Sequence, residues 1–168
     1  MRWLAAALLL CPVLCPGAAG AAAQQTQPYV RGSQQAILAA HRDQPFILAL
    51  WSLDCTHCRD DLEILGSLQA KYPALKVVLV STDTPDREAE LQSVIGRYAL
   101  QRSESWVFAD DYTERLRHQV DPGWYGELPR TYFFAADGMA TAQSGKIGFD
   151  ATERWINLHV GAAGKGRR

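Results

Sequence analysis

Two cysteines separated by two residues, Cys55 and Cys58, carry the clearest chemical signal in this 168-residue chain. They follow a near-continuous apolar run of strand length, and leucines recur after them at helical spacing. The pair is therefore predicted to open a helix, where unpaired N–H groups and about half a positive charge favour a thiolate. We predict a redox couple in which Cys55 attacks a substrate disulfide and Cys58 resolves the mixed disulfide.

Two other uses of the cysteine pair stay open. A zinc or copper site needs further ligands, but His41, His118 and His159 are scattered singly and no second C-x-x-C occurs. A purely structural disulfide would close a very short ring and constrain little of the unfolded chain. The sequence therefore favours redox chemistry over a non-enzymatic copper- or zinc-binding module.

The N-terminal segment indicates export. Residues 1–23 combine a positive start, a short apolar stretch broken by proline, and an A-x-A site ending at Ala23. The apolar stretch is shorter than the roughly 20 residues that span a bilayer. We predict a signal peptide over residues 1–23, with an uncleaved anchor as the alternative, and a periplasmic location in a cell with two membranes. Cleavage removes Cys11 and Cys15 and leaves one cysteine pair in the mature chain.

Charge and length limit the other possibilities. The chain has 17 Lys+Arg and 18 Asp+Glu, a net charge of −1, which argues against nucleic acid as a partner. The mature length suits one domain with its own core. We expect a flexible leader over residues 24–32, a monomeric domain over residues 33–161 and a disordered basic tail over residues 162–168.

Hydrophobic patterning predicts an α/β domain. The apolar runs at residues 45–51 and 76–82 are predicted strands, and the helix after the cysteines joins them into a right-handed βαβ unit. Two further runs flank Asp137 and Gly138 and predict an antiparallel hairpin. The remaining expected elements are a helix over residues 86–98, a strand over 105–110, a helix over 113–120 and a C-terminal helix that begins near residue 150.

Three features of the chain resemble the thioredoxin superfamily, and particularly its exported TlpA/ResA-like branch of thiol–disulfide oxidoreductases. Trp51 stands four positions before the first cysteine, the C-x-x-C pair follows, and Pro129 precedes a late strand. The resemblance covers about residues 34–160. It implies a thioredoxin-like fold, with a central mixed β-sheet flanked by helices. It also implies a helix–strand insertion over residues 86–111, ahead of a cis-proline that lies against the disulfide.

The same resemblance implies the partners and the substrate groove. The substrates would be cysteines of client proteins, the electron source a membrane thiol carrier, and the only redox group the disulfide, with no other cofactor and no metal. Trp51, Leu128 and Pro129 would line the groove. Trp124 and Tyr125 belong to an unusually long loop before the proline, and they either contact a partner or anchor that loop in the core.

Two polar residues are candidates for tuning the couple. His57 precedes Cys58 directly, and a donor or imidazolium there favours a Cys55 thiolate, which makes the disulfide more oxidising than thioredoxin at about −270 mV. Asp61 lies one helical turn after Cys58. The related branch commonly carries an acidic residue at this position, which implies a proton acceptor for Cys58. The alternatives are a solvated histidine and a carboxylate that complements the helix end.

The direction of electron flow stays open between two interpretations. The resemblance favours a reductase that serves cytochrome or copper-site assembly. The histidine within the cysteine motif favours an oxidant or isomerase. Of the two, we favour the reductase.

Overall fold

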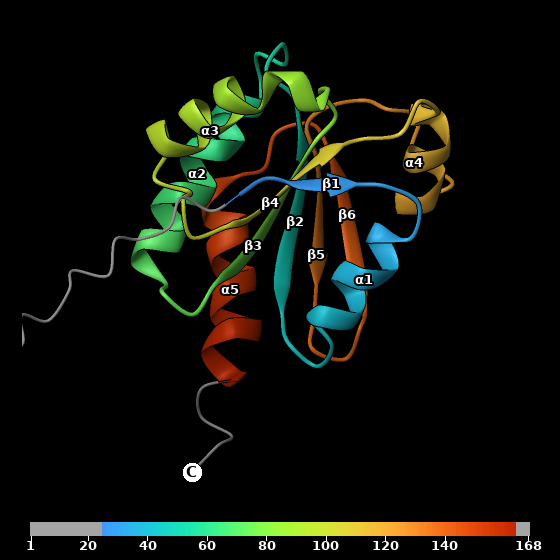
Figure 1. Ribbon diagram of the computed structural model, residues 1–168. Helices are drawn as coiled ribbons and strands as arrows, with labels where there is room; N and C mark the ends of the chain where they lie inside the picture. Colours follow the sequence, from blue (N-terminus) through green and yellow to red (C-terminus); the bar gives the residue numbers. More distant parts are fainter. Residues whose placement is uncertain (1–24, 164–168) are drawn as a thin grey trace, which may run out of the picture.

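The computed structural model describes residues 25–163 and shows a mixed β-sheet with helices on both faces (Figure 1). The strands are β1 Gln27–Tyr29, β2 Phe46–Trp51, β3 Lys76–Ser81, β4 Glu104–Phe108, β5 Arg130–Phe134 and β6 Ala140–Ser144. They lie in the order β1–β4–β3–β2–β5–β6. The first four are parallel, whereas β5 runs antiparallel to β2 and β6 runs antiparallel to β5. The predicted α/β class, βαβ unit and hairpin are confirmed.

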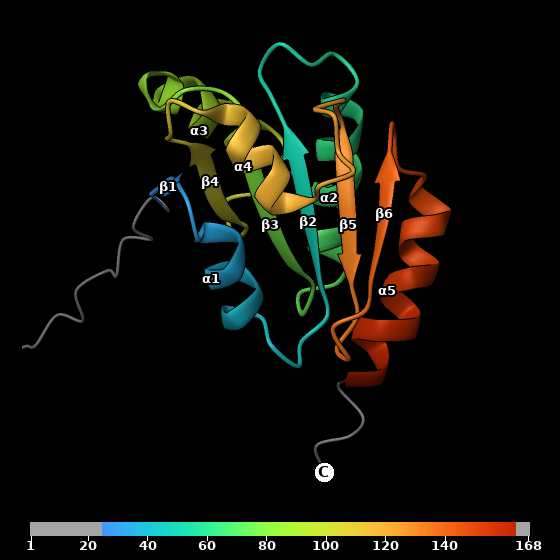
Figure 2. The same ribbon diagram turned by 90° about the vertical axis from the view of Figure 1, so that its right-hand side faces the viewer.

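Helices cover the two faces of the sheet unequally. The helices are α1 Ser33–Ala40, α2 Cys58–Lys71, α3 Glu88–Arg97 with the preceding 3-10 turn η1 Pro85–Arg87, α4 Thr113–Val120 and α5 Phe149–Ala163. Figures 1 and 2 show α2, α3 and α5 on one face and α1 and α4 on the other. The predicted helix–strand insertion is confirmed as α3 followed by β4. Across residues 25–163, every helix is too short or too polar to cross a bilayer.

Strand β2 is the centre of the sheet and leads to the redox pair. All its residues are buried, as expected for a strand that is covered on both faces. Ile47, Ala49 and Trp51 belong to the core beneath α2 and α5. Leu48 and Leu50 belong to the core beneath α1 and α4. The chain leaves β2 directly after Trp51, and residues 52–57, here called the redox turn, connect it to α2. The carboxyl end of the central strand therefore positions the redox turn.

The predicted flexible leader over residues 24–32 is wrong in its central part. Gln27–Tyr29 form β1, which pairs in parallel with β4 at the sheet edge. The ring of Tyr29 is fully buried, stacks on Phe108 at a centroid distance of 5.2 Å, and donates its hydroxyl hydrogen to Gln34 Oε1 at 2.9 Å. Burial of this one aromatic side chain fixes a segment that is otherwise polar and contains a proline, a residue that edge strands tolerate.

The domain limits also differ from the prediction at the C-terminal end. Ala162 and Ala163 belong to α5, so the helix passes the predicted boundary at residue 161, and assigning these residues to a disordered tail is wrong. The predicted signal peptide over residues 1–23 and residues 164–168 of the predicted tail lie outside the described residues.

A glycine sets how closely α2 approaches the end of α3. A side chain at Gly66 would run into the backbone carbonyl oxygen of Tyr98. Only glycine fits this contact without a shift of the backbone. The close approach fixes the position of α2, the helix whose first residue is the second cysteine.

Candidate active site

Cys55 and Cys58 form a disulfide at the junction of the redox turn and α2. The Cα atoms lie 5.4 Å apart, within the range that disulfides span. Cys55 lies in the turn after β2, and Cys58 is the first residue of α2. The backbone N–H of Cys58 points at the Cys55 sulfur, with N and Sγ 3.1 Å apart. A donor of the helix start is therefore directed at the sulfur that is predicted to become the thiolate.

The two sulfurs differ in accessibility. Cys58 is 1 % exposed and belongs to the core beneath α2 and α5. Cys55 is half-buried and packs against the edge of that core. A client sulfur can therefore approach Cys55 and not Cys58, which is the arrangement that the predicted attacking and resolving roles require.

The loop at Leu128 and Pro129 lies beside the redox turn because of strand register. Arg130 pairs with Leu50 in the antiparallel β2–β5 ladder. The residue before Arg130 therefore lies beside Trp51, the last residue of β2. The Leu128–Pro129 bond is cis, as the family resemblance implied. Leu128 is half-buried, and Pro129 is buried.

The aromatic side chains predicted near the groove separate into different roles. Trp51 is buried and packs in the core that holds Cys58, and its place in the substrate groove stays a prediction. Trp124 is 4 % exposed and belongs to the core on the opposite face, and its indole N–H donates to the Glu127 carbonyl at 2.8 Å. Placing Trp124 in the substrate groove is therefore wrong, since the ring anchors its loop. Tyr125 is 91 % exposed, and its contact with clients stays a prediction.

Asp61 is a buried carboxyl group one turn beyond Cys58. It is 2 % exposed, and its Oδ1 accepts the backbone N–H of Ile147 at 3.1 Å. Its Oδ2 has no hydrogen-bond partner among the described residues. Burial raises the pKa of Asp61 to about 6, and the neighbouring Asp60 adds to this rise. The group can thus change its protonation state close to neutral pH.

The loop before α5 contacts two consecutive carboxylates, Asp60 and Asp61, in the first turn of α2. Lys146 lies 3.0 Å from Asp60, and Ile147 donates its backbone N–H to Asp61. The exposed pair orients the loop, and the neighbouring residue closes over the buried carboxyl group. This arrangement excludes water from one side of Asp61, which is consistent with its raised pKa.

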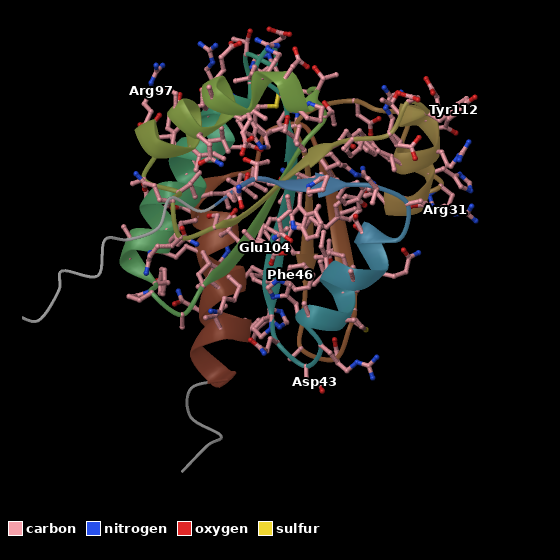
Figure 3. The ribbon with its side chains drawn as sticks, in the orientation of Figure 1. Arg31, Asp43, Phe46, Arg97, Glu104 and Tyr112 are labelled. Carbon is pink, nitrogen blue, oxygen red and sulfur yellow. A yellow bond between two sulfur atoms is a disulfide. The ribbon has the colours of Figure 1, made fainter. Side chains whose placement is uncertain are left out.

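His57 and the remaining histidines make no metal site with the cysteines. His57 is exposed, and its side chain has no hydrogen bond or ion pair within residues 25–163, so its tuning role stays a prediction. His41 is 2.9 Å from Glu104 and stacks on Phe46. Phe46 begins β2 and the cysteines follow the last residue of that strand, so this histidine lies at the other end of β2, near the labels of Phe46 and Glu104 in Figure 3. Within the described part of the chain, no group of three His, Cys, Asp or Glu residues is placed to bind a metal ion.

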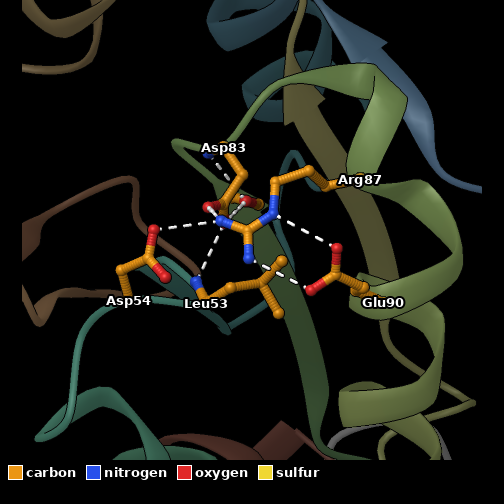
Figure 4. Close-up of polar contacts among 6 residues, drawn as sticks. Leu53, Asp54, Asp83, Arg87 and Glu90 are labelled. Atoms are coloured by element: carbon orange, nitrogen blue, oxygen red, sulfur yellow. Dashed lines mark hydrogen bonds and ion pairs between the residues drawn. The ribbon is translucent and has the colours of Figure 1, made fainter.

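The sequence analysis missed two polar residues that contact the turn before Cys55 and one that is buried on β5. Asp83 and Arg87 contact the redox turn from the carboxyl end of β3 (Figure 4). Thr131 faces Ala49 across the β2–β5 ladder, and its hydroxyl oxygen is buried without a partner within residues 25–163. A signal for Asp83 existed, because residues just beyond the carboxyl ends of parallel strands commonly form sites in α/β folds.

Solved structures share this fold, although no family model and no curated protein matches the sequence. One is a secreted disulfide oxidoreductase of Mycobacterium tuberculosis homologous to DsbE of E. coli (TM-score 0.56, 20% identity, 71% of this chain and 85% of that chain). Another is a thiol:disulfide interchange protein of the thioredoxin family from Chlorobium tepidum (TM-score 0.58, 13% identity, 73% and 84%). A third is a thio-disulfide isomerase from Thermus thermophilus (TM-score 0.52, 17% identity, 68% and 78%).

These similarities show which fold the chain has. The chain has a thioredoxin-like fold, as the sequence resemblance implied, and it places a C-x-x-C disulfide at the junction of the turn after β2 and α2. Its structural neighbours include both an oxidoreductase and an isomerase.

Proposed function

We propose that this protein is an exported thiol–disulfide oxidoreductase that exchanges its Cys55–Cys58 pair with cysteines of client proteins, in the direction of client reduction. The observation that carries the proposal is the unequal exposure of the two sulfurs. Cys55 is accessible at the turn, whereas Cys58 is 1 % exposed at the start of α2. The thiol:disulfide oxidoreductases among the structural neighbours support the same chemistry.

The proposed reaction moves two electrons from the protein dithiol to the client disulfide. The Cys55 thiolate attacks one client sulfur, which forms a Cys55–client disulfide and releases the other client sulfur as a thiolate that takes up a proton. The Cys58 sulfur then attacks Cys55, forms the internal disulfide and releases the second client thiol. The client disulfide is reduced to two thiols, and the protein dithiol is oxidised to the disulfide.

Asp61 is proposed as the proton acceptor in the second step. Cys58 must lose its proton to attack, and it lies in the core away from bulk water. The carboxylate one turn later on α2 is the acidic group on the same helical face, and its Oδ2 is free of hydrogen bonds to described residues. With a pKa raised to about 6 by burial, Asp61 is largely ionised at neutral pH and basic enough to accept a proton.

The proposal includes export, a monomeric state and a thiol electron source. Residues 1–23 have the pattern of a signal peptide, and the Mycobacterium tuberculosis neighbour is described as secreted. A membrane thiol carrier would return the disulfide to the dithiol, so the sulfur pair needs no further cofactor. Fractionation of cells expressing the full chain tests the location, and gel filtration of the secreted form tests the monomer.

Reduction of insulin disulfides tests the central claim. Cys55→Ser is expected to abolish insulin reduction, because the attacking sulfur is lost. Cys58→Ser is expected to accumulate mixed disulfides with clients, because the resolving sulfur is lost. Full turnover by either variant would contradict the scheme. If the wild-type protein oxidises a reduced client faster than it reduces an oxidised one, the proposed direction is wrong and the oxidant or isomerase assignment replaces it.

A further inference from the structure

The redox turn is hydrogen-bonded to a buried carboxylate, Asp83, that lies just beyond the end of β3. The Asp83 side chain is 5 % exposed. Its Oδ2 accepts the backbone N–H of Leu53 at 2.9 Å and the hydroxyl hydrogen of Ser81 at 2.6 Å (Figure 4). Leu53 is two residues before Cys55, so this bond fixes the backbone that leads directly to the attacking sulfur.

Arg87 extends the same contact to the next residue of the turn. One guanidinium nitrogen, Nη1, lies 3.2 Å from Asp83 Oδ1 and 3.0 Å from Asp54 Oδ2. The other, Nη2, lies 3.1 Å from Glu90 Oε2 on α3. Arg87 thus compensates the buried charge of Asp83, which would otherwise be costly, and it ties Asp54 to the same point. Figure 4 shows the guanidinium between these carboxylates.

These contacts act on the sulfur that the fold holds least firmly. Cys58 is fixed by the packing of α2 against the core. Cys55 lies in a turn outside regular secondary structure, and in the oxidised protein the S–S bond itself restrains it. Once that bond is reduced, the restraints that remain on the turn include the backbone bond at Leu53 and the ion pair at Asp54.

Restraint of the dithiol state favours closure of the disulfide. When two groups are held close together, ring closure loses less entropy and their effective concentration rises. A turn that keeps Cys55 near Cys58 therefore stabilises the disulfide relative to the dithiol and speeds the resolving step. A freely moving turn would do the opposite.

We propose that Asp83 and Arg87 are positioning residues that hold Cys55 within bridging reach of Cys58 in the dithiol state, and so favour the internal disulfide. This inference rests on the proposed redox function, and it assigns that function a further pair of residues that touch neither sulfur. Asp83 acts through its hydrogen bond with the Leu53 backbone, and Arg87 acts through its ion pair with Asp54.

A purely electrostatic role makes the opposite prediction for one variant. Loss of the Arg87 cation would destabilise a nearby Cys55 thiolate, so charge alone predicts a more stable disulfide in Arg87→Gln. Positioning predicts a less stable disulfide, because Asp54 is released and Asp83 loses its partner. A merely structural role would lower the stability of both redox states and leave the equilibrium between them unchanged.

The test is the equilibrium constant of the Cys55–Cys58 pair with glutathione, measured for the purified mature protein. Arg87→Gln is expected to shift this constant several-fold towards the dithiol. Asp83→Ala is expected to shift it about tenfold in the same direction, a rise in potential of about 30 mV. Asp83→Asn keeps an acceptor for Leu53 and is expected to shift it less than Asp83→Ala. Glu90→Gln is the matched control, since Glu90 contacts the same guanidinium but not the turn, and it is expected to stay within about twofold of wild type.

Several outcomes would overturn the inference. An Arg87→Gln constant equal to wild type, or shifted towards the disulfide, excludes positioning. Equal shifts in Asp83→Asn and Asp83→Ala would assign the effect to charge. If Asp83→Ala does not fold, the sign of the Arg87→Gln shift decides alone, because that side chain is partly exposed. A wild-type pair that fails to exchange with glutathione would instead contradict the proposed function itself.

Discussion

The two halves of the disulfide lie in contrasting surroundings. Cys55 is half-buried in a turn bordered by exposed and ionic side chains, with Asp54 paired to Arg87. Cys58 is buried in an apolar core, where the nearest acidic residue on its helical face is Asp61, with one oxygen that lacks a hydrogen bond to any described residue. The polar side is accessible to a client protein, and the apolar side is closed to it.

This contrast suggests a division of the chemistry between the two sides. In the proposed mechanism, restraint and client recognition belong to the Cys55 side, which is open to water. Proton transfer is proposed for the Cys58 side, where low polarity makes a carboxylate a stronger base. A buried carboxylate with one oxygen that lacks a hydrogen bond to any described residue lowers the stability of the fold, a cost that the proposed role of Asp61 would explain.

The largest expected effect comes from removing the base on the Cys58 side. Asp61→Asn is expected to slow closure of the mixed disulfide by about 10³-fold, the middle of the range for general-base catalysis. In wild type the closure rate should fall as pH drops below about 6, because Asp61 becomes protonated, and this step should be absent in Asp61→Asn. Rapid-mixing measurements of mixed-disulfide decay between pH 5 and 8 check both points.

The neighbouring carboxylate supplies the control for this kinetic prediction. Asp60 is exposed and paired with Lys146, so Asp60→Asn removes a charge one residue away, weakens one contribution to the raised pKa of Asp61 and keeps the Asp61 carboxyl group itself. It is expected to retain closure within about threefold of wild type. Equal slowing in both variants would assign the effect to general electrostatics and would remove Asp61 from the mechanism.

The second expected effect of Asp61→Asn is on stability. The variant that slows the reaction should make the fold more stable. Because the pKa of Asp61 is raised from 3.8 to about 6 on folding, the native state binds its proton more tightly than the unfolded chain does. This group's contribution to stability is therefore lost as pH rises from about 4 to 6, and the loss reaches about 3 kcal/mol at pH 7. The advantage of Asp61→Asn over wild type in urea unfolding should grow by about 2 kcal/mol from pH 4 to pH 7, since part of the loss is already complete at pH 4. An advantage that stays constant with pH would contradict the buried, ionised carboxylate.

The same contrast explains which features could be predicted from sequence. Local patterns determined the redox pair: an apolar strand, a C-x-x-C and a helical repeat of leucines follow one another along the chain, so their placement needs no long-range information. Asp61 was also within reach, because helical spacing alone puts it on the face of Cys58. The Cys58 side is built mainly from one continuous segment.

The Cys55 side depends on contacts between distant segments, which patterning does not reveal. Asp83 meets Leu53 across 30 positions of sequence. Trp124 could be assigned to a groove or a core with equal reason until the sheet showed which face it covers. The strand at Gln27–Tyr29 has no apolar alternation, and its order depends on the burial of one tyrosine ring in the fold.

A moderate effect on substrate binding is expected in the loop before Pro129, which carries Tyr125. Tyr125 is 91 % exposed, so if it contacts clients, Tyr125→Ser should raise the KM for a protein substrate by about five-fold without changing kcat or stability. Tyr112→Ser is the control, because Tyr112 is an exposed tyrosine at the start of α4 (Figure 3). Equal KM changes in the two variants, or no change in either, would remove Tyr125 from client recognition.

The smallest expected effect concerns His57, on the exposed side of the helix start. Removal of its side chain in His57→Ala should lower the reduction potential, since a donor near Cys55 stabilises the thiolate. The side chain is exposed and makes no hydrogen bond or ion pair with another described residue, so solvent should screen its influence. The shift should therefore stay below about 30 mV, less than a tenfold change in the glutathione equilibrium. Thr56→Ala, an exposed and uncharged change in the same turn, should leave the potential unaltered. If both variants shift equally, the turn backbone and not the imidazole sets the potential, and the restraint at Leu53 and Asp54 becomes the main control of this couple.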